Sequence, residues 1–466
     1  MKKTTFALFF GNRGFFPGSL MAGARKEMVE ELEKLGYGTL IMDEKATPYG
    51  AVESPEDGAK YARFLAANRG KYDGVILCLP NFGDETGAIS ALQDAGAPIM
   101  IQAYPDELDK MGCNCRRDAF CGKFSVMDVF FQYGLPFTTF KPHTVHPTDG
   151  TFARHVSWFA AVCRVVNGMK RMTVGAIGAR TTAFKTIRFD ELTLQQYGIT
   201  TETLDLSEVM LRVRDQKTNS EKYHAKAERL KNYTRWNGVP DEAFVTLTKL
   251  SVVLDDLIVE YGMDAMALRC WLEIEKELKV SPCVLLSEIN DRGIPAACEL
   301  DVCNAIAMHS LSLASERAAT CLDWNNNYGA DDDKCILFHC GPVAQSLMIG
   351  KGMVTEHQIL AKALGAGCTY GCNVGRIAPG PLTFSSSKTQ NGSLIFYLGE
   401  GEFTGDKIPD DFFGCAGVAR IDRLQDKLAR IGQHGFRHHV GVTSGHVEIA
   451  LREAWGKYLN YKICEL

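Results

Sequence analysis

The run Thr5-Phe-Ala-Leu-Phe-Phe10 opens a stretch in which apolar strands alternate with amphipathic helices. A helical run at 22–35 follows it, the next apolar strands are at 38–42 and 73–79, and a further helix is predicted near 55–68. Strand and helix in alternation predict an open parallel sheet, because a crossover helix returns the chain to the same end of the sheet. The first third of the chain is therefore predicted to be an α/β domain.

A second alternation begins at Met172 and gives way to short strands beyond about residue 345, where glycine, serine and threonine become frequent. The predicted strands of this part are 172–177, 200–205, 265–269, 283–287, 294–298 and 335–339, and its predicted helices are near 189–197, 220–231 and 302–314. The fold class is α/β, with two Rossmann-like doubly wound parallel-sheet domains before a mainly β C-terminal domain. The predicted domains are 1–170, 171–345 and 346–466.

Composition excludes several classes of protein. The chain has 466 residues, 46% of them apolar and 23% charged, which is globular composition and rules out intrinsic disorder. Its net charge is −5 and no basic run is present, so nucleic acid is not an expected partner. No apolar stretch approaches about 20 residues, and the first ten residues lack a cleavage site, so we expect a cytoplasmic protein without membrane contact.

The sixteen cysteines indicate a reducing compartment. Several lie in apolar runs, where reduced cysteine serves as a small hydrophobic residue. Cys113, Cys115 and Cys121 form the tightest cluster along the sequence, but they have no histidine at zinc-finger spacing. Free thiols are favoured there over a structural zinc.

Two glycine-containing loops invite a nucleotide interpretation that their spacing does not support. Gly11-Asn12-Arg13-Gly14 and Gly175-Ala-Ile-Gly178-Ala-Arg180 both follow predicted strands. Neither matches GxGxxG, and neither has the lysine of a P-loop. We therefore interpret them as strand-to-helix turns, and nicotinamide chemistry is disfavoured.

Three polar segments interrupt surroundings that predict burial. Ile294-Pro-Ala-Ala-Cys-Glu299-Leu-Asp301 ends a strand in two carboxylates, Asp323 precedes an asparagine run, and His438-His439 leads into a late strand. Glu299, Asp323 and a histidine would form a mixed oxygen and nitrogen site suited to manganese or magnesium. Each also has a structural explanation: Glu299 as a helix cap, Asp323 as the start of an Asx-turn, and paired histidines as surface residues.

At these segments the chain resembles the superfamily of L-fucose isomerase and L-arabinose isomerase. The resemblance also rests on Phe9-Phe10-Gly11-Asn12-Arg13, Ala265-Met-Ala-Leu-Arg269-Cys-Trp271 and His339. It implies a manganese-dependent aldose–ketose isomerase acting through an enediol, with magnesium or cobalt as alternative ions. Glu299 and Asp323 would be both metal ligands and the acid/base pair, and His439 would be the third ligand.

The resemblance also implies partners and substrate contacts. The expected assembly is a homo-oligomer, a trimer or hexamer, with active sites at subunit interfaces that Arg13 reaches from a neighbouring subunit. Arg269 and His339 would contact the sugar, with a metal-ligand role or a core role for His339 as alternatives. Arg13 on the surface and Trp271 in the core are the corresponding structural explanations.

The sequence is shorter than fucose isomerases, so the identity of the sugar is left open. A neutral, L-fucose-like sugar is the first expectation. Arg13, Arg269 and Arg376 could instead supply a guanidinium to a sulfonate or phosphate, so an anionic sugar such as sulfoquinovose is the alternative substrate. A sugar-binding protein without turnover is the alternative outside enzymes.

Overall fold

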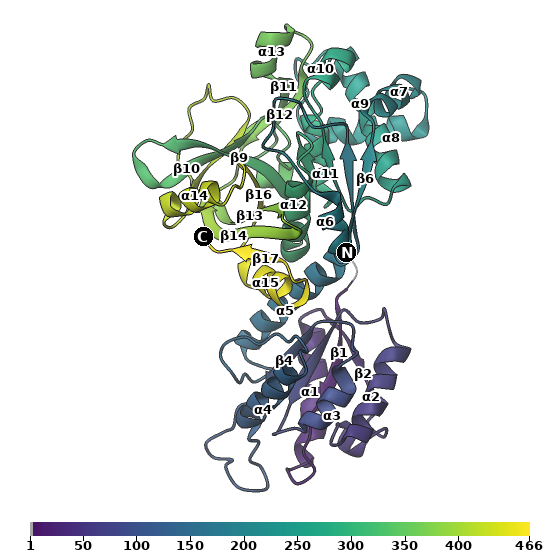
Figure 1. Ribbon diagram of the computed structural model, residues 1–466, viewed down its shortest axis with the longest axis vertical. Coiled ribbons are helices and arrows are strands. Elements are labelled where there is room, and N and C mark those ends of the chain that lie inside the picture. The colour runs from purple at the N-terminus through teal and green to yellow at the C-terminus, as the bar shows by residue number, and fades with distance from the viewer. Residues whose placement is uncertain (1–2) are drawn as a thin grey trace. The chain divides into compact units, whose positions relative to one another are not determined.

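The structure is a computed structural model that describes residues 3–466 in two compact units (Figure 1). The N-terminal unit runs to Asn167 and includes Arg452–Tyr458, whereas the second unit contains Gly168–Leu451 and Leu459–Leu466. Within the described part of the chain, no helix is both long enough and apolar enough to cross a membrane.

The N-terminal unit contains a four-stranded parallel sheet in the order β2-β1-β3-β4. Its strands are β1 (Thr5–Phe10), β2 (Gly38–Ile41), β3 (Gly74–Leu79) and β4 (Ile99–Ala103), and its helices are α1 (Ser19–Lys34), α2 (Pro55–Ala67), α3 (Glu85–Leu92), α4 (Ala119–Gln132) and α5 (Gly150–Met169), which ends at the junction of the units. The central strand β3 is buried along its whole length, which explains its continuous apolar sequence.

The second unit contains another four-stranded parallel sheet, in the order β6-β5-β7-β8. Its strands are β5 (Met172–Ile177), β6 (Ile199–Leu204), β7 (Ala265–Leu268) and β8 (Ala296–Cys298), and its helices are α6 (Glu191–Gln196), α7 (Leu206–Asp215), α8 (Glu221–Tyr233), α9 (Asp241–Glu260), α10 (Glu273–Leu278), α11 (Cys283–Asp291) and α12 (Val302–Ser315). The two parallel sheets confirm the predicted doubly wound architecture.

A nine-stranded mixed sheet completes the second unit, in the order β11-β12-β15-β10-β9-β16-β13-β14-β17. Its strands are β9 (Ala319–Tyr328), β10 (Asp331–His339), β11 (Met353–Glu356), β12 (Tyr370–Arg376), β13 (Gly380–Gln390), β14 (Ser393–Phe403), β15 (Cys415–Arg420), β16 (His439–Ser444) and β17 (Lys462–Cys464), and the helices of this part are α13 (Gln358–Leu364), α14 (Leu424–Gln433) and α15 (Glu448–Glu453). Because β14 also pairs with β15, the six strands from β15 to β14 in that order close into a barrel. This part is mainly β, as predicted.

Helix α12 packs against strands of both sheets of the second unit, β7 of the parallel sheet and β13 and β16 of the mixed one. Eleven of its 14 residues are buried, so its sequence is apolar on every face rather than amphipathic. The helix fixes the end of β8, where its N-terminus begins, relative to the barrel.

One predicted strand is wrong. Residues 283–287 are the first part of helix α11, which follows Pro282 and is buried from Cys283 to Asn290. A helix buried on all sides loses the polar face that would reveal its period, so a short apolar run of this kind looks the same as a buried strand.

The three-domain division stays a prediction. The structure adds that β9 and β10, which precede the predicted boundary at 345, are strands of the mixed sheet. The predicted division instead assigns them to the central domain.

Candidate active site beside the second parallel sheet

The second parallel sheet brings several of the predicted residues to one edge. Its strand order reverses direction between β5 and β7, and the carboxyl ends of parallel strands beside such a reversal are where α/β folds bind ligands. Arg269 follows β7 at this edge, and Glu299 follows β8.

The backbone after β8 turns sharply to present Glu299. Glu299 and Leu300 have φ values of 62° and 65°, the left-handed region that side chains other than glycine rarely adopt. Asp301 then caps α12, its side chain accepting a hydrogen bond of 3.0 Å from the Asn304 amide. The capping role considered for Glu299 therefore belongs to Asp301, which leaves the Glu299 side chain free for other contacts.

Three neighbouring strands of the barrel bring the remaining residues together. Asp323 on β9 lies opposite His439 on β16 and opposite Phe338 on β10. His339 is the next residue of β10, and its ring centroid is 5.8 Å from that of His439. The barrel thus assembles two imidazoles and a carboxylate that are far apart in the sequence.

These side chains converge on Nε2 of His439. That nitrogen lies 3.2 Å from Oε2 of Glu299 and 3.6 Å from Oδ1 of Asp323. Among the described residues these three atoms and Nε2 of His339 are buried and have no hydrogen-bond partner. Buried polar atoms are nearly always satisfied, so four unsatisfied atoms here indicate a ligand site.

The other ring nitrogen of His439 is fixed by Asp301. Nδ1 of His439 donates to Oδ2 of Asp301 at 2.9 Å, and Nε of Arg437 donates to the same oxygen. Burial opposes ionisation of Asp301, but the charge of Arg437 and the bond to His439 lower its pKa to about 2. With the proton on Nδ1, a neutral His439 turns the Nε2 lone pair toward the two carboxylates.

The donor set fits a hard or borderline divalent cation. Ligands about 2.1 Å from such an ion lie about 3 Å apart at adjacent octahedral corners, close to the distances around His439. Burial raises the pKa of Glu299, but its interactions with His439 lower it overall, so the carboxylate is ionised as a cation ligand must be. His438 lies in reach as well: one nitrogen of His438, one of His439 and one Glu299 oxygen lie within 4.8 Å of one another.

His339 shows a different hydrogen-bond pattern from His439. The backbone amide of Cys340 donates to Nδ1 of His339 at 2.9 Å. Because an amide can only donate, Nδ1 is an acceptor, and the neutral ring then carries its proton on Nε2. Nε2 of His339 can therefore donate a hydrogen bond in the site, but it has no lone pair to offer to an ion.

A cavity of about 320 Å³ lies next to these residues. Glu299, His339, His357 and Glu275 contribute its polar side chains, and the other lining residues are Cys270, Trp271, Cys283, Phe338, Cys340, Ile359 and Leu360. Burial raises the pKa of Glu275 to about 7. Among residues 3–466, no arginine or lysine lines this cavity, and the aromatic and aliphatic lining suits the apolar face of a sugar ring.

Aromatic side chains border the candidate cation site. The Phe184 ring lies 5.6 Å from that of Trp271 and 5.9 Å from that of His439, measured between centroids. Trp271 is thus both packed against the core and part of the cavity wall.

The three arginines considered for an anionic substrate are all engaged. Arg269 pairs with Glu273, although its Nε has no partner among the described residues. Arg376 donates to carbonyl oxygens at Gly375, Pro409, Phe412 and Gly414.

Arg13 belongs to the N-terminal unit. There it pairs with Glu85, donates to the Gly83 carbonyl at 2.8 Å and stacks on Phe82 with a separation of 4.5 Å. These contacts hold the side chain without identifying a substrate.

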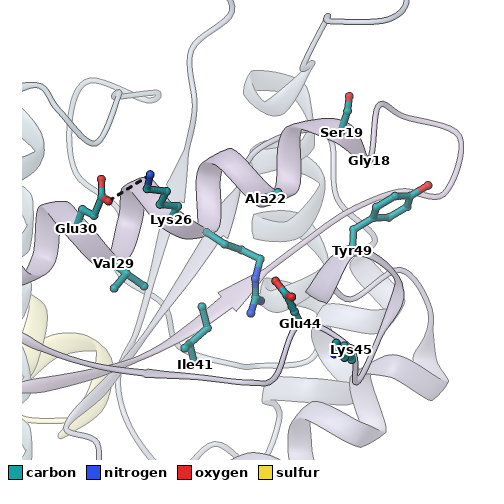
Figure 2. A pocket seen from close by; sticks show the side chains of 11 residues that line it. Gly18, Ser19, Ala22, Lys26, Val29, Glu30, Ile41, Glu44, Lys45 and Tyr49 are labelled. Carbon is teal, nitrogen blue, oxygen red and sulfur yellow. Dashed lines mark ion pairs between the residues drawn. The ribbon is translucent and has the colours of Figure 1, made fainter.

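A further cavity of about 610 Å³ lies in the N-terminal unit (Figure 2). It contains Arg25 and Glu44, and Lys26 and Glu30 at its wall are 3.8 Å apart. None of the predicted site residues lines it, so its size alone does not make it the active site.

Five residues at or near this site were not predicted as functional from the sequence: Asp301, His438, Arg437, Phe184 and Glu275. The signal for Asp301 was its position immediately before a predicted helix. Nothing in the sequence pointed to Arg437, because its partner is 136 residues away.

Comparison with known proteins identifies the family. Residues 7–170 match the domain described as fucose/sulfoquinovose isomerase, N-terminal domain, and residues 337–466 match L-fucose isomerase, C-terminal domain. A sulfoquinovose isomerase of Priestia aryabhattai is 22% identical over 85% of this chain and 86% of its own length. One from Alkalicoccus urumqiensis is 20% identical over 90% of this chain and 91% of its own. The chain therefore belongs to the L-fucose isomerase family, within the superfamily that its sequence resembles, and is an aldose–ketose isomerase.

Proposed function

We propose that the chain is a metal-dependent isomerase that interconverts a sugar aldose and its ketose through an enediol. The observation that carries this proposal is the convergence of unsatisfied atoms from Glu299, Asp323, His439 and His339 at one buried point. The adjacent cavity of about 320 Å³ is at the lower end of the range for small-molecule sites, which suits a monosaccharide.

Glu299, Asp323 and His439 would hold the ion, with manganese expected and magnesium or cobalt as alternatives. Bound there, the ion would polarise the carbonyl and the adjacent hydroxyl of the sugar. Asp301 and Arg437 keep His439 oriented, because the buried ion pair fixes the carboxylate to which Nδ1 donates.

Glu299 lines the cavity, so we assign it the proton transfer at carbon. It takes the proton from carbon 2 of the aldose, which yields the enediol, and the proton returns to carbon 1 as the ketose forms. The hydroxyl proton of oxygen 2 moves to oxygen 1, with Asp323 as the second carboxylate of the pair. No atoms are gained or lost in this sequence.

His339 is assigned to the substrate rather than to the ion. Its Nε2 proton, set by the Cys340 amide, can donate to a sugar oxygen on which negative charge develops. The side chain is 3% exposed and lines the cavity, so that hydrogen bond would form away from bulk water.

Two classes of sugar are candidates, each favoured by its own observation. The relatives named sulfoquinovose isomerase, which align over most of this chain, favour a sulfonated hexose. The absence of arginine and lysine from the lining of the described cavity favours a neutral or deoxy sugar such as L-fucose. A sulfonate would need a guanidinium from elsewhere, and Arg13 of a neighbouring subunit is the candidate.

A panel of neutral, deoxy and sulfonated aldoses, assayed for ketose with and without a chelator, tests the proposal. We expect one class to be converted, the conversion to stop after chelation and manganese to restore it. Full activity in metal-free protein would reject the mechanism. Glu299→Gln is the matched variant: it should bind sugar but lose proton exchange at carbon 2 in deuterated water. If the unmodified protein shows no exchange with any sugar, the binding-protein alternative is favoured instead.

We also propose a homo-oligomer, a trimer or hexamer, with Arg13 completing the site of a neighbouring subunit. We further propose a cytoplasmic location, which is supported by sixteen free thiols, because such thiols persist in reducing compartments.

A further inference from the structure

Five cysteines from five different segments gather behind the candidate active site. They are Cys270 after β7, Cys283 at the start of α11, Cys298 at the end of β8, Cys340 after β10 and Cys372 on β12. All are free thiols and all are buried. They are five of the sixteen cysteines in the chain.

The sulfur atoms lie at close, specific distances. Cys283 Sγ is 3.4 Å from Cys340 Sγ and 3.8 Å from Cys372 Sγ. All three lie within 4.8 Å of one another, and Cys298 interacts with both Cys283 and Cys340. The cluster formed by Cys283, Cys340, Cys372 and Cys298 is called the thiol cluster below.

The backbone around the thiol cluster is adapted to this close approach. Gly341 follows Cys340, and a Cβ placed on it would lie 2.6 Å from the Asn373 amide nitrogen and 2.9 Å from the Cα of Cys372. Gly371 precedes Cys372 with a φ of 137°, and a Cβ there would lie 1.8 Å from the Ser281 carbonyl oxygen. Only glycine lets these three segments meet, so the cysteines are held together by the backbone.

We propose that the thiol cluster binds a single soft metal ion of the zinc class, with Cys283, Cys340 and Cys372 as ligands and Cys298 as the fourth donor. Zinc–sulfur bonds of about 2.3 Å in a tetrahedron place the sulfurs about 3.8 Å apart, and the observed separations are 3.4 Å and 3.8 Å. Separations this short leave no room for inorganic sulfide between the ligands, which selects a mononuclear ion over an iron–sulfur cluster.

This site differs in chemistry from the one formed by Glu299, Asp323 and His439. Thiolates select zinc or monovalent copper, whereas carboxylates and imidazole suit manganese or magnesium. Cys283 and Cys340 also line the cavity of about 320 Å³, which gives an ion a route to the cluster.

The ion would support the active site through the backbone. Cys298 directly precedes Glu299, and Cys340 directly follows His339. Cross-linking these residues would hold both functional side chains in place without touching the substrate.

Cobalt substitution of the purified full-length protein tests the proposal. Zinc is removed with a chelator, cobalt(II) is added, and the near-ultraviolet spectrum is recorded. Sulfur-to-cobalt charge transfer gives an intense band that oxygen and nitrogen ligands do not give. We expect this band in the unmodified protein and in Glu299→Gln, and about one zinc per subunit by elemental analysis of Glu299→Gln protein as isolated.

Variants locate the site. Cys283→Ser and Cys372→Ser should lose the band, whereas Cys335→Ser, at a buried cysteine packed in a different part of the core, should keep it. If a variant does not fold, the presence or absence of the charge-transfer band in the unmodified protein still tests whether thiolates bind the ion. Absence of the band there, its persistence in both cluster variants, or a disulfide between Cys283 and Cys340 in the isolated protein would overturn the proposal.

Discussion

Asp301 has two roles, of which its position in the sequence can indicate only one. The sequence suggests Glu299 as the helix cap, but Asp301, directly before α12, is the cap through its 3.0 Å bond to the Asn304 amide. Its second oxygen binds His439, 138 residues later, and Arg437. Local pattern can predict a cap, but it cannot predict a partner that only the tertiary fold supplies. Glu299, Asp323 and His439, in contrast, could be named from residue type and resemblance, and the fold does bring them together.

Asp301→Asn should weaken the candidate cation site without removing any of its ligands. The neutral amide attracts the Nδ1 proton of His439 less strongly than the carboxylate does, so we expect manganese affinity to fall about 10- to 100-fold in a binding titration. Arg437 loses its buried counter-charge, and the free energy of unfolding should drop by about 3–5 kcal/mol in denaturant. Asp406→Asn, which breaks an ion pair with Lys334 near the surface, is the control and should change neither value appreciably. Unchanged manganese affinity in Asp301→Asn would show that His439 does not need this partner.

His339→Gln separates a substrate contact from a metal ligand. If Nε2 donates to the sugar, kcat/KM should fall by about 100-fold while manganese affinity stays as it was. A parallel loss of manganese affinity would instead make His339 a ligand and contradict the proton placement set by the Cys340 amide.

At the scale of elements, predictability depends on the length of an apolar run as well as on its exposure. Helix α12 was predicted correctly at 302–314, a run too long for a typical buried strand, even though the helix is buried on every face. Helix α11 was missed, because its short apolar run has no exposed face to show a helical period. The strands of the parallel sheets were the easiest to predict, since a strand buried on both faces reads as a continuous apolar run. Because α12 is buried, its His309 should make the free energy of unfolding depend on pH.

Burial of His309 within α12 lowers its pKa to about 4, although the charge of Asp264 acts in the opposite direction. An unfolded chain, with a histidine pKa of about 6.5, binds more protons than the folded one between those values. The free energy of unfolding should therefore fall as the pH drops from about 6.5 to about 4, by about 3 kcal/mol from this group.

Denaturant unfolding as a function of pH checks this expectation. His309→Gln should flatten the slope across that interval, whereas His224→Gln, at an exposed histidine on α8, should leave it intact. An identical slope in His309→Gln would assign the acid sensitivity to other groups.

At the scale of the whole molecule, the order of the α/β and β parts along the chain could be predicted from the sequence. The closure of the C-terminal strands into a barrel could not. Alternating strands and helices predict parallel sheets, and the rise of glycine and serine beyond residue 345 predicts a mainly β end. The barrel is closed by the pairing of β14 with β15. The sequences of these two strands do not indicate that they pair or in which register. The meeting of five cysteines depends on the same long-range arrangement. The proposed oligomer needs an experiment of its own, because it involves contacts between subunits.

Mixing two inactive variants tests whether Arg13 acts across subunits. Arg13→Ala and Glu299→Gln should each be nearly inactive, for different reasons. Co-refolding or co-expression in equal amounts should restore roughly a quarter of the sites, because some then receive Arg13 from one subunit and Glu299 from its neighbour. No recovery in confirmed mixed oligomers would place Arg13 outside the neighbouring site.

The central claim is that Glu299, Asp323 and His439 bind one divalent cation, and manganese titration monitored by the paramagnetic resonance of the free ion tests it most directly. In chelator-treated protein the account predicts one bound manganese per subunit, with binding lost in Glu299→Gln, Asp323→Asn and His439→Asn and kept in Glu275→Gln, at a neighbouring cavity carboxyl that is not assigned to the ion. Equal manganese binding by the unmodified protein and all three ligand variants would contradict it.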